Sequence, residues 1–383
     1  MTATDVQPVF VRRMLEEAKP APTLMTGPIG WLRANLFSSP LNSALTILAI
    51  LLIAWVVPPF VRFLVIDATW TGVDREACLP SATRPEVGVC WPFVYERIGY
   101  FIYGSYPVAQ RWRVDIFFAL LAVGVGWLLW LKAPRRDLGA IYAFVVLPVV
   151  SFILLRGWPV LGLATVETAY WGGALVTIVV AAVGIAVSLP IGILLALGRR
   201  SRMPAVKLFS VIYIEFVRGV PLITVLFMAS VMLPLFVPDA WSPEKMLRAL
   251  VGIAMFASAY MAEVVRAGLQ AIPKGQYEGA MAVGLGYRHM MRLVVLPQAL
   301  KVTIPNIVNT YIGLFKDTTL ISIVGMFDLL RTIEAARIDP KWATPVTSAT
   351  GYVVAAIFYF AFCYSMARYA RYTEARLARA DRR

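Results

Sequence analysis

The stretch GALVTIVVAAVGIAVSLPIGILLAL, residues 173–197, contains no charged side chain. A run of about 18 or more apolar residues is long enough to cross the hydrocarbon core of a bilayer as a helix. Small side chains recur at every fourth position within it, at Gly184, Ser188, Gly192 and Ala196. This spacing places them on one face of a helix, where a second helix can approach closely. The stretch therefore predicts a membrane-spanning helix that packs closely against another helix, either of this chain or of a partner chain.

The composition of the whole chain also indicates a membrane protein. Of the 383 residues, 60% are hydrophobic and 15% are charged, whereas about 25% are charged in soluble chains. One histidine and three cysteines leave little material for a histidine-based metal site or a catalytic triad. We therefore expect no catalytic residue, no metal and no cofactor. The net charge of +14 does not indicate nucleic acid, because the basic residues lie in short clusters between apolar runs.

Eight apolar runs are candidates for spanning helices. They are Leu41–Ile66, Val114–Leu131, Leu138–Leu155, Gly173–Leu197, Ile212–Phe236, Leu247–Val265, Leu296–Phe315 and Ala349–Ala367. Polar residues and a proline interrupt the seventh run, at Lys301, Pro305, Asn306 and Asn309. The sequence therefore predicts an all-α polytopic membrane protein with about eight transmembrane helices.

The connectors between these runs predict the orientation of the chain. If the N-terminus is cytoplasmic, the cytoplasmic segments carry 21 Lys and Arg and the external segments carry 10. Positively charged residues are enriched on the cytoplasmic side of membrane proteins, so both termini are expected there. The first apolar run begins too far from Met1, and is too long, for a cleavable signal. Residues 1–40 are therefore predicted to be a cytoplasmic tail, and residues 372–383 a second, basic one.

Two cysteines, Cys78 and Cys90, fall in the long external loop 67–113. A bacterial periplasm permits a disulfide, and the spacing of twelve residues fits either a disulfide or two unpaired thiols. Cys363 lies in the last predicted span, where we expect it to contribute to packing.

Ionisable residues within the later spans form two pairs with a spacing of three. Glu215 and Arg218 make one pair, and Glu263 and Arg266 make the other. A single charge in lipid is costly, so such residues usually pair or face a cavity. Residues three apart lie on one helix face, and each pair can therefore neutralise itself and stabilise the bundle.

A second polar group follows the seventh run. Lys316 and Asp317 are followed by Thr318 and Thr319, and the preceding helix contains Asn309. A helix that breaks at membrane depth frees backbone groups that can bind a polar solute. The five residues are therefore a candidate substrate path. The alternative is that Lys316 and Asp317 pair with other helices and only hold the bundle together.

The connector 266–299, on the cytoplasmic side, has a pattern of its own. Pro273 is suited to open a short helix, Gly284 and Gly286 form a bend, and Pro297 begins the next span. Two short helices with a glycine elbow can form a docking knob for a soluble partner. A solvated hairpin with no partner fits this pattern equally well.

Residues within this connector resemble a family motif. Permeases of binding-protein-dependent ABC importers carry Glu-Ala-Ala, three residues, Gly, nine residues, Ile, one residue and Leu-Pro. The chain matches this spacing at Glu278, Gly279, Ala280, Gly284, Val294, Leu296 and Pro297. Gly279 and Val294 depart from the motif, each toward a similar or smaller side chain. The resemblance implies that the loop 273–292 contacts an ATPase.

The resemblance extends over about residues 165–371 and is closest to the polar amino-acid branch. It implies a type 1 permease core of five helices at 166–371, preceded by an N-terminal extension of three helices at 41–165. Such an extension resembles the M-type permeases of general L-amino-acid uptake systems. The chain contains no Gly-Lys dipeptide, so it has no phosphate-binding loop of the ATPase type.

The family resemblance also implies partners and a mechanism. We expect an ABC ATPase dimer, a second homologous permease chain, a periplasmic amino-acid-binding protein, an amino-acid substrate and the lipid bilayer. ATP hydrolysis would drive alternating access. An ion-coupled secondary carrier is the alternative, although the inverted repeat common in carriers is not evident between residues 1–165 and 166–371. A membrane scaffold or sensor is a further alternative.

Overall fold

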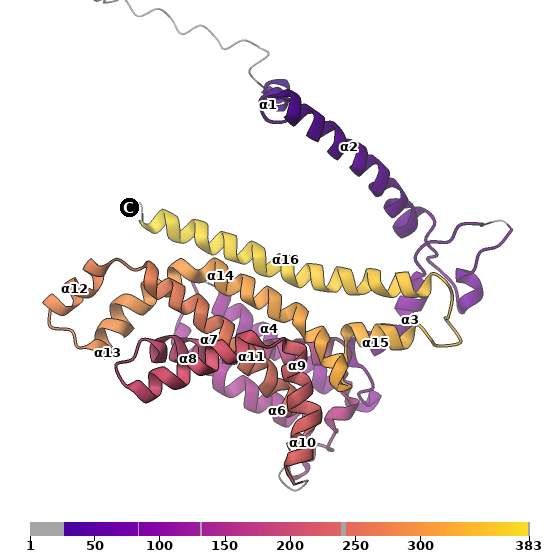
Figure 1. Ribbon diagram of the computed structural model, residues 1–383. Coiled ribbons are helices and arrows are strands. Elements are labelled where there is room, and N and C mark those ends of the chain that lie inside the picture. Colours follow the sequence, from indigo (N-terminus) through magenta and orange to yellow (C-terminus); the bar gives the residue numbers. More distant parts are fainter. Residues whose placement is uncertain (1–26, 83, 131, 239–242, 382–383) are drawn as a thin grey trace, which may run out of the picture. The chain divides into compact units, whose positions relative to one another are not determined.

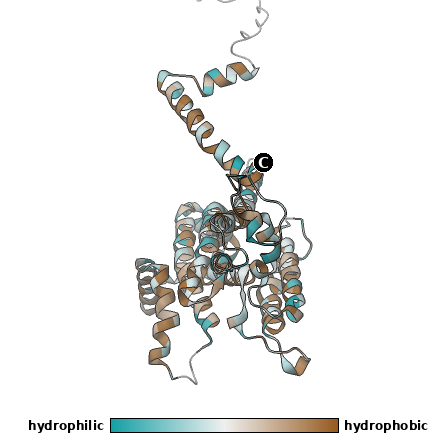
Figure 2. Ribbon diagram, turned by 90° about the vertical axis from the view of Figure 1, so that its right-hand side faces the viewer, coloured by the Kyte–Doolittle hydropathy of each residue, from teal (hydrophilic) through white to brown (hydrophobic). Residues whose placement is uncertain are grey.

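The computed structural model describes residues 27–82, 84–130, 132–238 and 243–381. The chain forms two compact units, one ending at Ala68 and the other beginning at Thr69. The first unit contains α1 (Gly27–Asn35) and α2 (Pro40–Val61), which continues into a π-helical turn, Arg62–Ile66. Ser39 caps α2 by accepting a hydrogen bond from the Asn42 amide. Apolar residues occupy nearly the whole of α2 (Figure 2), as expected for a helix surrounded by lipid.

The second unit begins with the helices of the N-terminal extension. They are a 3-10 turn at Arg75–Cys78, α3 (Trp91–Tyr103), α4 (Arg111–Leu129), α5 (Arg136–Ile141) and α6 (Leu147–Arg156), with shorter 3-10 turns at Val108–Gln110, Pro159–Leu161 and Thr168–Tyr170 and a π-helical turn at Tyr142–Val146. Helices α4 and α6 pack against each other, and α3 packs against three later helices, α7, α15 and α16.

The remaining helices complete the bundle shown in Figure 1. They are α7 (Gly173–Arg199), α8 (Pro204–Gly219), α9 (Leu222–Phe227), α10 (Leu233–Phe236), α11 (Lys245–Ala271), α12 (Lys274–Ala282), α13 (Tyr287–Met290), α14 (Leu296–Asp317), α15 (Leu329–Ala336) and α16 (Thr347–Asp381). π-helical turns lie at Met228–Met232 and Met291–Val295, a 3-10 segment at Thr318–Val324, and a two-residue strand, β1, at Phe327–Asp328.

The central contact of the bundle joins α7 and α11. A methyl group on Gly192 would lie 2.8 Å from the Cβ of Met261, and one on Gly184 would lie 2.9 Å from Leu314 of α14. The stripe of small residues on α7 is therefore used within this chain, which resolves the two possibilities that the sequence left open.

Seven helices in the described residues are long and apolar enough to cross a membrane, or eight if one bent pair counts as a span. The seven are Pro40–Ile66, Val108–Leu129, Arg136–Arg156, Gly173–Arg199, Lys245–Ala271, Tyr287–Val324 and Thr347–Leu377. The predicted fold class, an all-α polytopic membrane protein with about eight spanning helices, is confirmed.

The expected continuous span Ile212–Phe236 is wrong in one respect. Its two halves, Pro204–Gly219 and Leu222–Phe236, meet at an angle of 104°. Pro221 causes the break, because proline lacks an N–H and forces the preceding residue out of the helical conformation. Val220 accordingly adopts φ −112° and ψ 136°.

The expected start of the seventh span at Leu296 is also wrong. The helix runs without interruption from Tyr287, and Pro297 lies inside it, directly after the π-helical turn Met291–Val295. The wider turn accommodates the point at which proline removes a helical hydrogen bond. Pro297 therefore marks a local widening of this helix and not its first turn.

The N-terminal extension shares a hydrophobic core with the later helices. Val114 and Phe117 of α4 and Leu155 of α6 belong to the same buried cluster as Leu175 of α7 and Leu226 of α9. The Arg113 guanidinium donates to the Ala164 carbonyl at 2.8 Å. In the described part of the chain no separate core begins near residue 165, and the two compact units divide at Ala68. The division near residue 165 rests on the family resemblance and stays a prediction about domains.

Candidate coupling and transport sites

The connector between α11 and α14 folds into one separate short helix, α12, and then α13, which is the first turn of the long helix that continues into α14. Pro273 precedes α12, and the turn that follows is closed by hydrogen bonds from the Gly284 amide to Met281 and from the Leu285 amide to Ala280. Gly284 has φ +78°, a conformation that costs little for glycine and is strained for other residues. Nothing lies within 4 Å of a side chain added there, so backbone conformation and not space requires this glycine.

One side of this loop is buried and the other is open. Ala280 packs in a cluster with Met290, Met291 and Leu269. On the outer side, Met281 and Val283 are 57% and 75% exposed, and Glu278 is exposed beside them. The loop projects from one end of the bundle (Figure 1). An apolar tip with an acidic residue, held on a packed base, is suited to dock into a partner.

The remaining motif residues lie at the foot of α14. Leu296 is partly buried and Pro297 exposed, and the motif residue Gly279 is exposed in α12 with open space around it. The structure thus brings the predicted motif together in the projecting loop and at its junction with the long helix.

Polar contacts tie the loop to the base of the bundle. The Tyr277 hydroxyl donates to the Leu269 carbonyl at 3.1 Å and accepts from Nη1 of Arg200 at 3.1 Å. The Gln298 amide donates to the Gln276 side chain at 3.0 Å. The loop is therefore connected to the ends of α7 and α11 and to α14.

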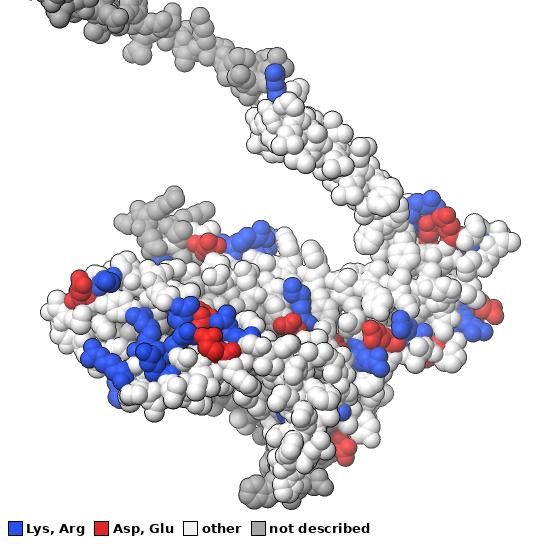
Figure 3. Space-filling model, viewed as in Figure 1, with Lys and Arg blue, Asp and Glu red and all other residues white. Residues whose placement is uncertain are grey.

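An ion-pair network lies on the neighbouring turns. Glu263 contacts Arg266 at 2.8 Å, Arg199 at 2.9 Å and Arg218 at 3.5 Å. Arg199 also contacts Glu215 at 2.8 Å. Figure 3 shows acidic side chains among basic ones over α7, α8 and α11. The network thus joins α7, α8 and α11.

The sequence expectation for these residues needs one correction. Glu263 and Arg266 pair within α11 as their spacing suggests, but Glu215 pairs with Arg199 and not with Arg218. The guanidinium of Arg218 lies 5.5 Å from the Tyr260 ring of α11, so it is drawn to the neighbouring helix, where it reaches Glu263. The sequence analysis did not predict a role for Arg199, which it counted only among the basic residues that indicate the cytoplasmic side. The position of Arg199 at the end of an apolar run could have identified it.

The candidate substrate path lies on α14 and the segment after it. The expected break of the helix does not occur, since α14 continues to Asp317 and narrows into the 3-10 segment Thr318–Val324. The hydroxyls of Thr318 and Thr319 donate to the carbonyls of Phe315 and Lys316, three residues back. The hydrogens of the two hydroxyls are therefore used within the helix and are not donated to a solute.

Asn309, Lys316 and Asp317 lie in a different environment from the two threonines. Among the described residues, neither Lys316 nor Asp317 forms an ion pair with another helix, and Lys316 and Asn309 are exposed. Asn309 and Lys316 are seven residues apart and therefore share one helix face. Gly313 lies between them with open space beyond it. One face of a spanning helix is thus polar and uncovered by the rest of the described chain.

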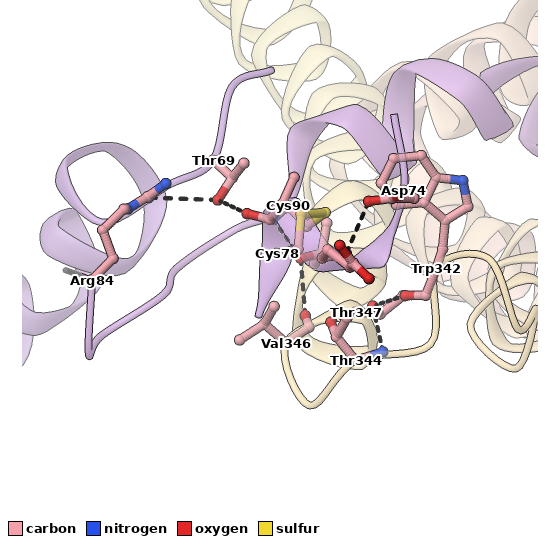
Figure 4. Close-up of a disulfide and its surroundings, with 12 residues drawn as sticks. Thr69, Asp74, Cys78, Arg84, Cys90, Trp342, Thr344, Val346 and Thr347 are labelled. Atoms are coloured by element: carbon pink, nitrogen blue, oxygen red, sulfur yellow. Dashed lines mark hydrogen bonds between the residues drawn. A yellow bond between two sulfur atoms is a disulfide. The ribbon is translucent and has the colours of Figure 1, made fainter. Parts of the chain in front are cut away.

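The opposite end of the bundle carries a cross-linked cap. The structure joins Cys78 and Cys90 by a disulfide, which lies against the segment that contains Trp342, Thr344 and Thr347 (Figure 4). The Cys90 amide donates to the Thr350 hydroxyl of α16 at 3.0 Å. Trp342 is only 1% exposed and packs with both cysteines. The loop of the extension and the start of α16 therefore form one packed structure.

The cap contains an acidic residue that sequence reasoning did not single out. Asp328 is fully buried and accepts hydrogen bonds from the amides of Leu330 and Arg331, which begin α15. Burial raises the pKa of Asp328 to about 6, against the two amides that favour its charged form. Its place directly before an apolar helical stretch is that of a helix N-cap, and this signal could have identified it.

No group of three or more His, Cys, Asp or Glu lies close enough to hold a metal ion in the part of the chain that the structure describes. The described residues form a projecting loop, a charged base, a polar helix face and a cross-linked cap.

The chain belongs to the family of binding-protein-dependent transport system inner membrane components, whose model matches residues 188–379. The protein is thus a multi-pass inner-membrane permease of the ABC class. The alternative of an ion-coupled secondary carrier is not supported.

Several relatives are similar over most of the chain. The inner membrane amino-acid ABC transporter permease protein YhdY of Escherichia coli K12 is 50% identical over 346 residues, which cover 90% of this chain and 92% of the relative. The glutamate/glutamine/aspartate/asparagine transport system permease protein BztC of Rhodobacter capsulatus is 38% identical, with 97% and 99% covered. Among solved structures, an amino acid ABC transporter with histidines covers 53% of this chain and 92% of that chain, at 27% identity and a TM-score of 0.47.

Proposed function

We propose that this permease imports L-amino acids into the bacterial cytoplasm by alternating access, driven by a separate ABC ATPase dimer. The projecting loop is the observation that carries the proposal, because it presents an apolar tip beside Glu278 at the foot of the bundle. The names of YhdY and BztC support amino acids as the substrate class. The chain itself has no phosphate-binding loop, so we assign ATP hydrolysis to the partner.

The loop 273–292 would insert its tip into a groove of the ATPase. Met281 and Val283 supply apolar area, and Glu278 would pair with a basic residue of the ATPase. Closure of the ATPase dimer would then displace the loop and tilt the bundle as a rigid body. A periplasmic amino-acid-binding protein would deliver the substrate to the other end.

The polar face of α14 supports a path for the substrate between two permease chains. Polar residues in a spanning helix face a cavity or a partner and not lipid. A homologous second permease chain opposite this face would enclose Asn309, Gly313 and Lys316. An amino-acid zwitterion needs an anion for its ammonium group and a donor for its carboxylate, and Asp317 and Lys316 can supply them.

The proposed orientation places both termini and the projecting loop in the cytoplasm. The disulfide-linked cap lies at the other end of the bundle from this loop (Figure 1). Disulfides persist in a periplasm and are rare in the cytosol, which supports an external cap. The excess of Lys and Arg in the segments assigned to the cytoplasm supports the same orientation.

A pair of glycine variants tests the proposed contact with the ATPase. Gly284→Val places a β-branched residue at φ +78°, whereas Gly286 has φ −65° and open space around it, so Gly286→Val is a matched control. The strain of Gly284→Val is on the order of 1–3 kcal/mol, enough to change the shape of the tip. We expect Gly284→Val to abolish amino-acid uptake and co-purification of the ATPase, with normal membrane insertion, and Gly286→Val to retain both. Normal uptake by Gly284→Val would contradict the assignment.

A further inference from the structure

We propose that Arg200 and Tyr277 form the link through which the projecting loop moves the base of the transmembrane bundle. This inference rests on the proposed function, in which the loop 273–292 contacts the ATPase. It adds two positioning residues that the family motif does not contain, one of them outside the loop.

Tyr277 lies on the inner side of α12, away from the exposed tip. Its hydroxyl donates to the Leu269 carbonyl in the last turn of α11 and accepts from Arg200 at the end of α7, each at 3.1 Å. Nη1 of Arg200 also reaches the Leu269 carbonyl at 3.4 Å, and the guanidinium lies 5.6 Å from the centre of the Tyr277 ring. One hydroxyl thus joins the projecting loop to two long helices.

The neighbouring residue extends this connection. Arg200 ends α7 as its C-cap, and Arg199 is the last residue of that helix. Adjacent residues on a helix point in directions about 100° apart, and the two arginines indeed have separate partners. Arg199 contacts Glu215 of α8 at 2.8 Å and Glu263 of α11 at 2.9 Å. If Tyr277 moves, Arg200 therefore moves with it at the corner between α7 and α8. The adjacent Arg199 then transmits this movement to Glu215 and Glu263.

The other contacts of the loop are less suited to this role. Ala280 packs against apolar side chains, and such contacts have no preferred direction and allow sliding. The hydrogen bond between Gln276 and Gln298 is directional but leads to α14. The hydrogen bond between Arg200 and Tyr277 is directional. It connects the loop to Arg200, which is next to Arg199 in the ion-pair network of α7, α8 and α11.

The test compares Tyr277→Phe and Arg200→Gln with Arg202→Gln. Phenylalanine keeps the ring and removes the hydroxyl. Arg202 is an exposed residue on the same corner, so Arg202→Gln removes the same charge two residues away. Each permease is purified with its ATPase and sister chain and reconstituted in proteoliposomes with the binding protein. Uptake of radiolabelled L-glutamine and L-glutamate is measured together with ATP hydrolysis.

The decisive quantity is the number of amino-acid molecules transported per ATP hydrolysed. We expect it to fall about fivefold in Tyr277→Phe and Arg200→Gln, as for the loss of one hydrogen bond in a coupled step, and to equal the wild-type value in Arg202→Gln. Because the two residues act through one contact, the double variant should fall no further than either single variant. Arg200→Lys should be intermediate, since it keeps the charge but not the planar group.

Three outcomes for the transport ratio would overturn the link. They are an unchanged ratio in Tyr277→Phe, equal losses in Arg200→Gln and Arg202→Gln, and multiplied losses in the double variant. Loss of co-purifying ATPase from Tyr277→Phe alone would also overturn it, because the hydroxyl would then act in docking. Failure of the wild-type chain to retain any ATPase contradicts the proposed function itself and the link with it, and is distinguishable from the other outcomes.

Discussion

Glu263 is the carboxylate on which the charged base of the bundle depends. Three arginines approach it, from α7, α8 and α11, and its side chain is 16% exposed. Charges this far from water require partners, and removal of one partner leaves the others uncompensated. The choice of partners was not evident from sequence, because a spacing of three identifies neighbours on one helix and says nothing of residues on the next. Arg199 and Arg218 become partners only when α7 and α8 fold against α11.

Replacing Glu263 with Gln tests this dependence. The variant keeps the shape of the side chain and leaves three arginines without their shared anion, so we expect a loss of about 1–3 kcal/mol in stability. Glu215→Gln is the control, because that side chain is 56% exposed and meets Arg199 alone, which predicts a loss under about 1 kcal/mol. Thermal unfolding of the purified protein in detergent measures both. Equal shifts in the two variants would mean that Glu263 is not the centre of the network.

Asp328 predicts a dependence of stability on pH. Its pKa is about 6 in the folded protein because it is buried, against about 3.9 in an unfolded chain. A raised pKa means that protonation favours the folded state, so this contribution is complete below pH ~4 and is lost as pH rises through ~6. The nearby carboxylate of Glu334 raises the pKa further, whereas the two backbone amides and Tyr359 lower it.

The measurement compares the wild type with Asp328→Asn, which cannot titrate at this position. The free energy of unfolding of the wild type, relative to that of the variant, should be about 1 kcal/mol larger at pH 5 than at pH 7.5. Both proteins share every other titrating group, so their difference isolates this carboxylate. A difference that is constant between the two pH values would show that Asp328 keeps an ordinary pKa.

At the scale of helices, the apolar runs predicted where most elements lie but not how they end. The run Ile212–Phe236 is apolar apart from Glu215 and Arg218, and mean hydropathy alone cannot register the break that Pro221 makes within it. The glycine elbow and the first short helix of the projecting loop were well predicted, because both have local causes, whereas the second short helix is the first turn of a long helix. The long helix that contains α14 begins at Tyr287. This start could not be predicted, since a proline is typical of a helix start and Pro297 here lies after a π-helical turn.

Lys316 and Asp317, at the end of α14, have two interpretations that an experiment can separate. Pairing with other helices was the alternative to a substrate path, and no such ion pair occurs among the residues described. Asp317→Asn keeps the shape and removes the charge. If Asp317 holds the substrate ammonium group, the variant should change the preference among acidic, neutral and basic amino acids by about fivefold or more. Competition uptake in proteoliposomes measures this, and an equal fall for all three classes would support a purely structural role.

At the scale of the whole chain, the extension and the permease core are less separate than their sequences suggest. The family model begins at residue 188, yet α3, α4 and α6 share buried clusters with the core helices. The family match over residues 188–379 therefore does not correspond to a unit of packing. The two compact units divide instead at Ala68, within the extension.

The orientation of the second unit is the remaining prediction at this scale, and two valines test it directly. Val160 lies in a segment expected outside and is 87% exposed, and Val283 lies at the tip of the projecting loop and is 75% exposed. Each is replaced by Cys in a chain that carries Cys363→Ser. The native Cys78 and Cys90 are buried and joined, so they react slowly and provide a low background.

A membrane-impermeant thiol reagent should label Val160→Cys in intact spheroplasts and should label Val283→Cys only after the membrane is opened with detergent. The two sites have similar exposure, so a difference between them reports the side of the membrane and not accessibility. The disulfide between Cys78 and Cys90 favours the same orientation, because disulfides persist in oxidising compartments and are rare in the cytosol. Labelling of Val283→Cys in intact spheroplasts would invert the orientation, and a loop exposed outside could not contact an ATPase in the cytoplasm.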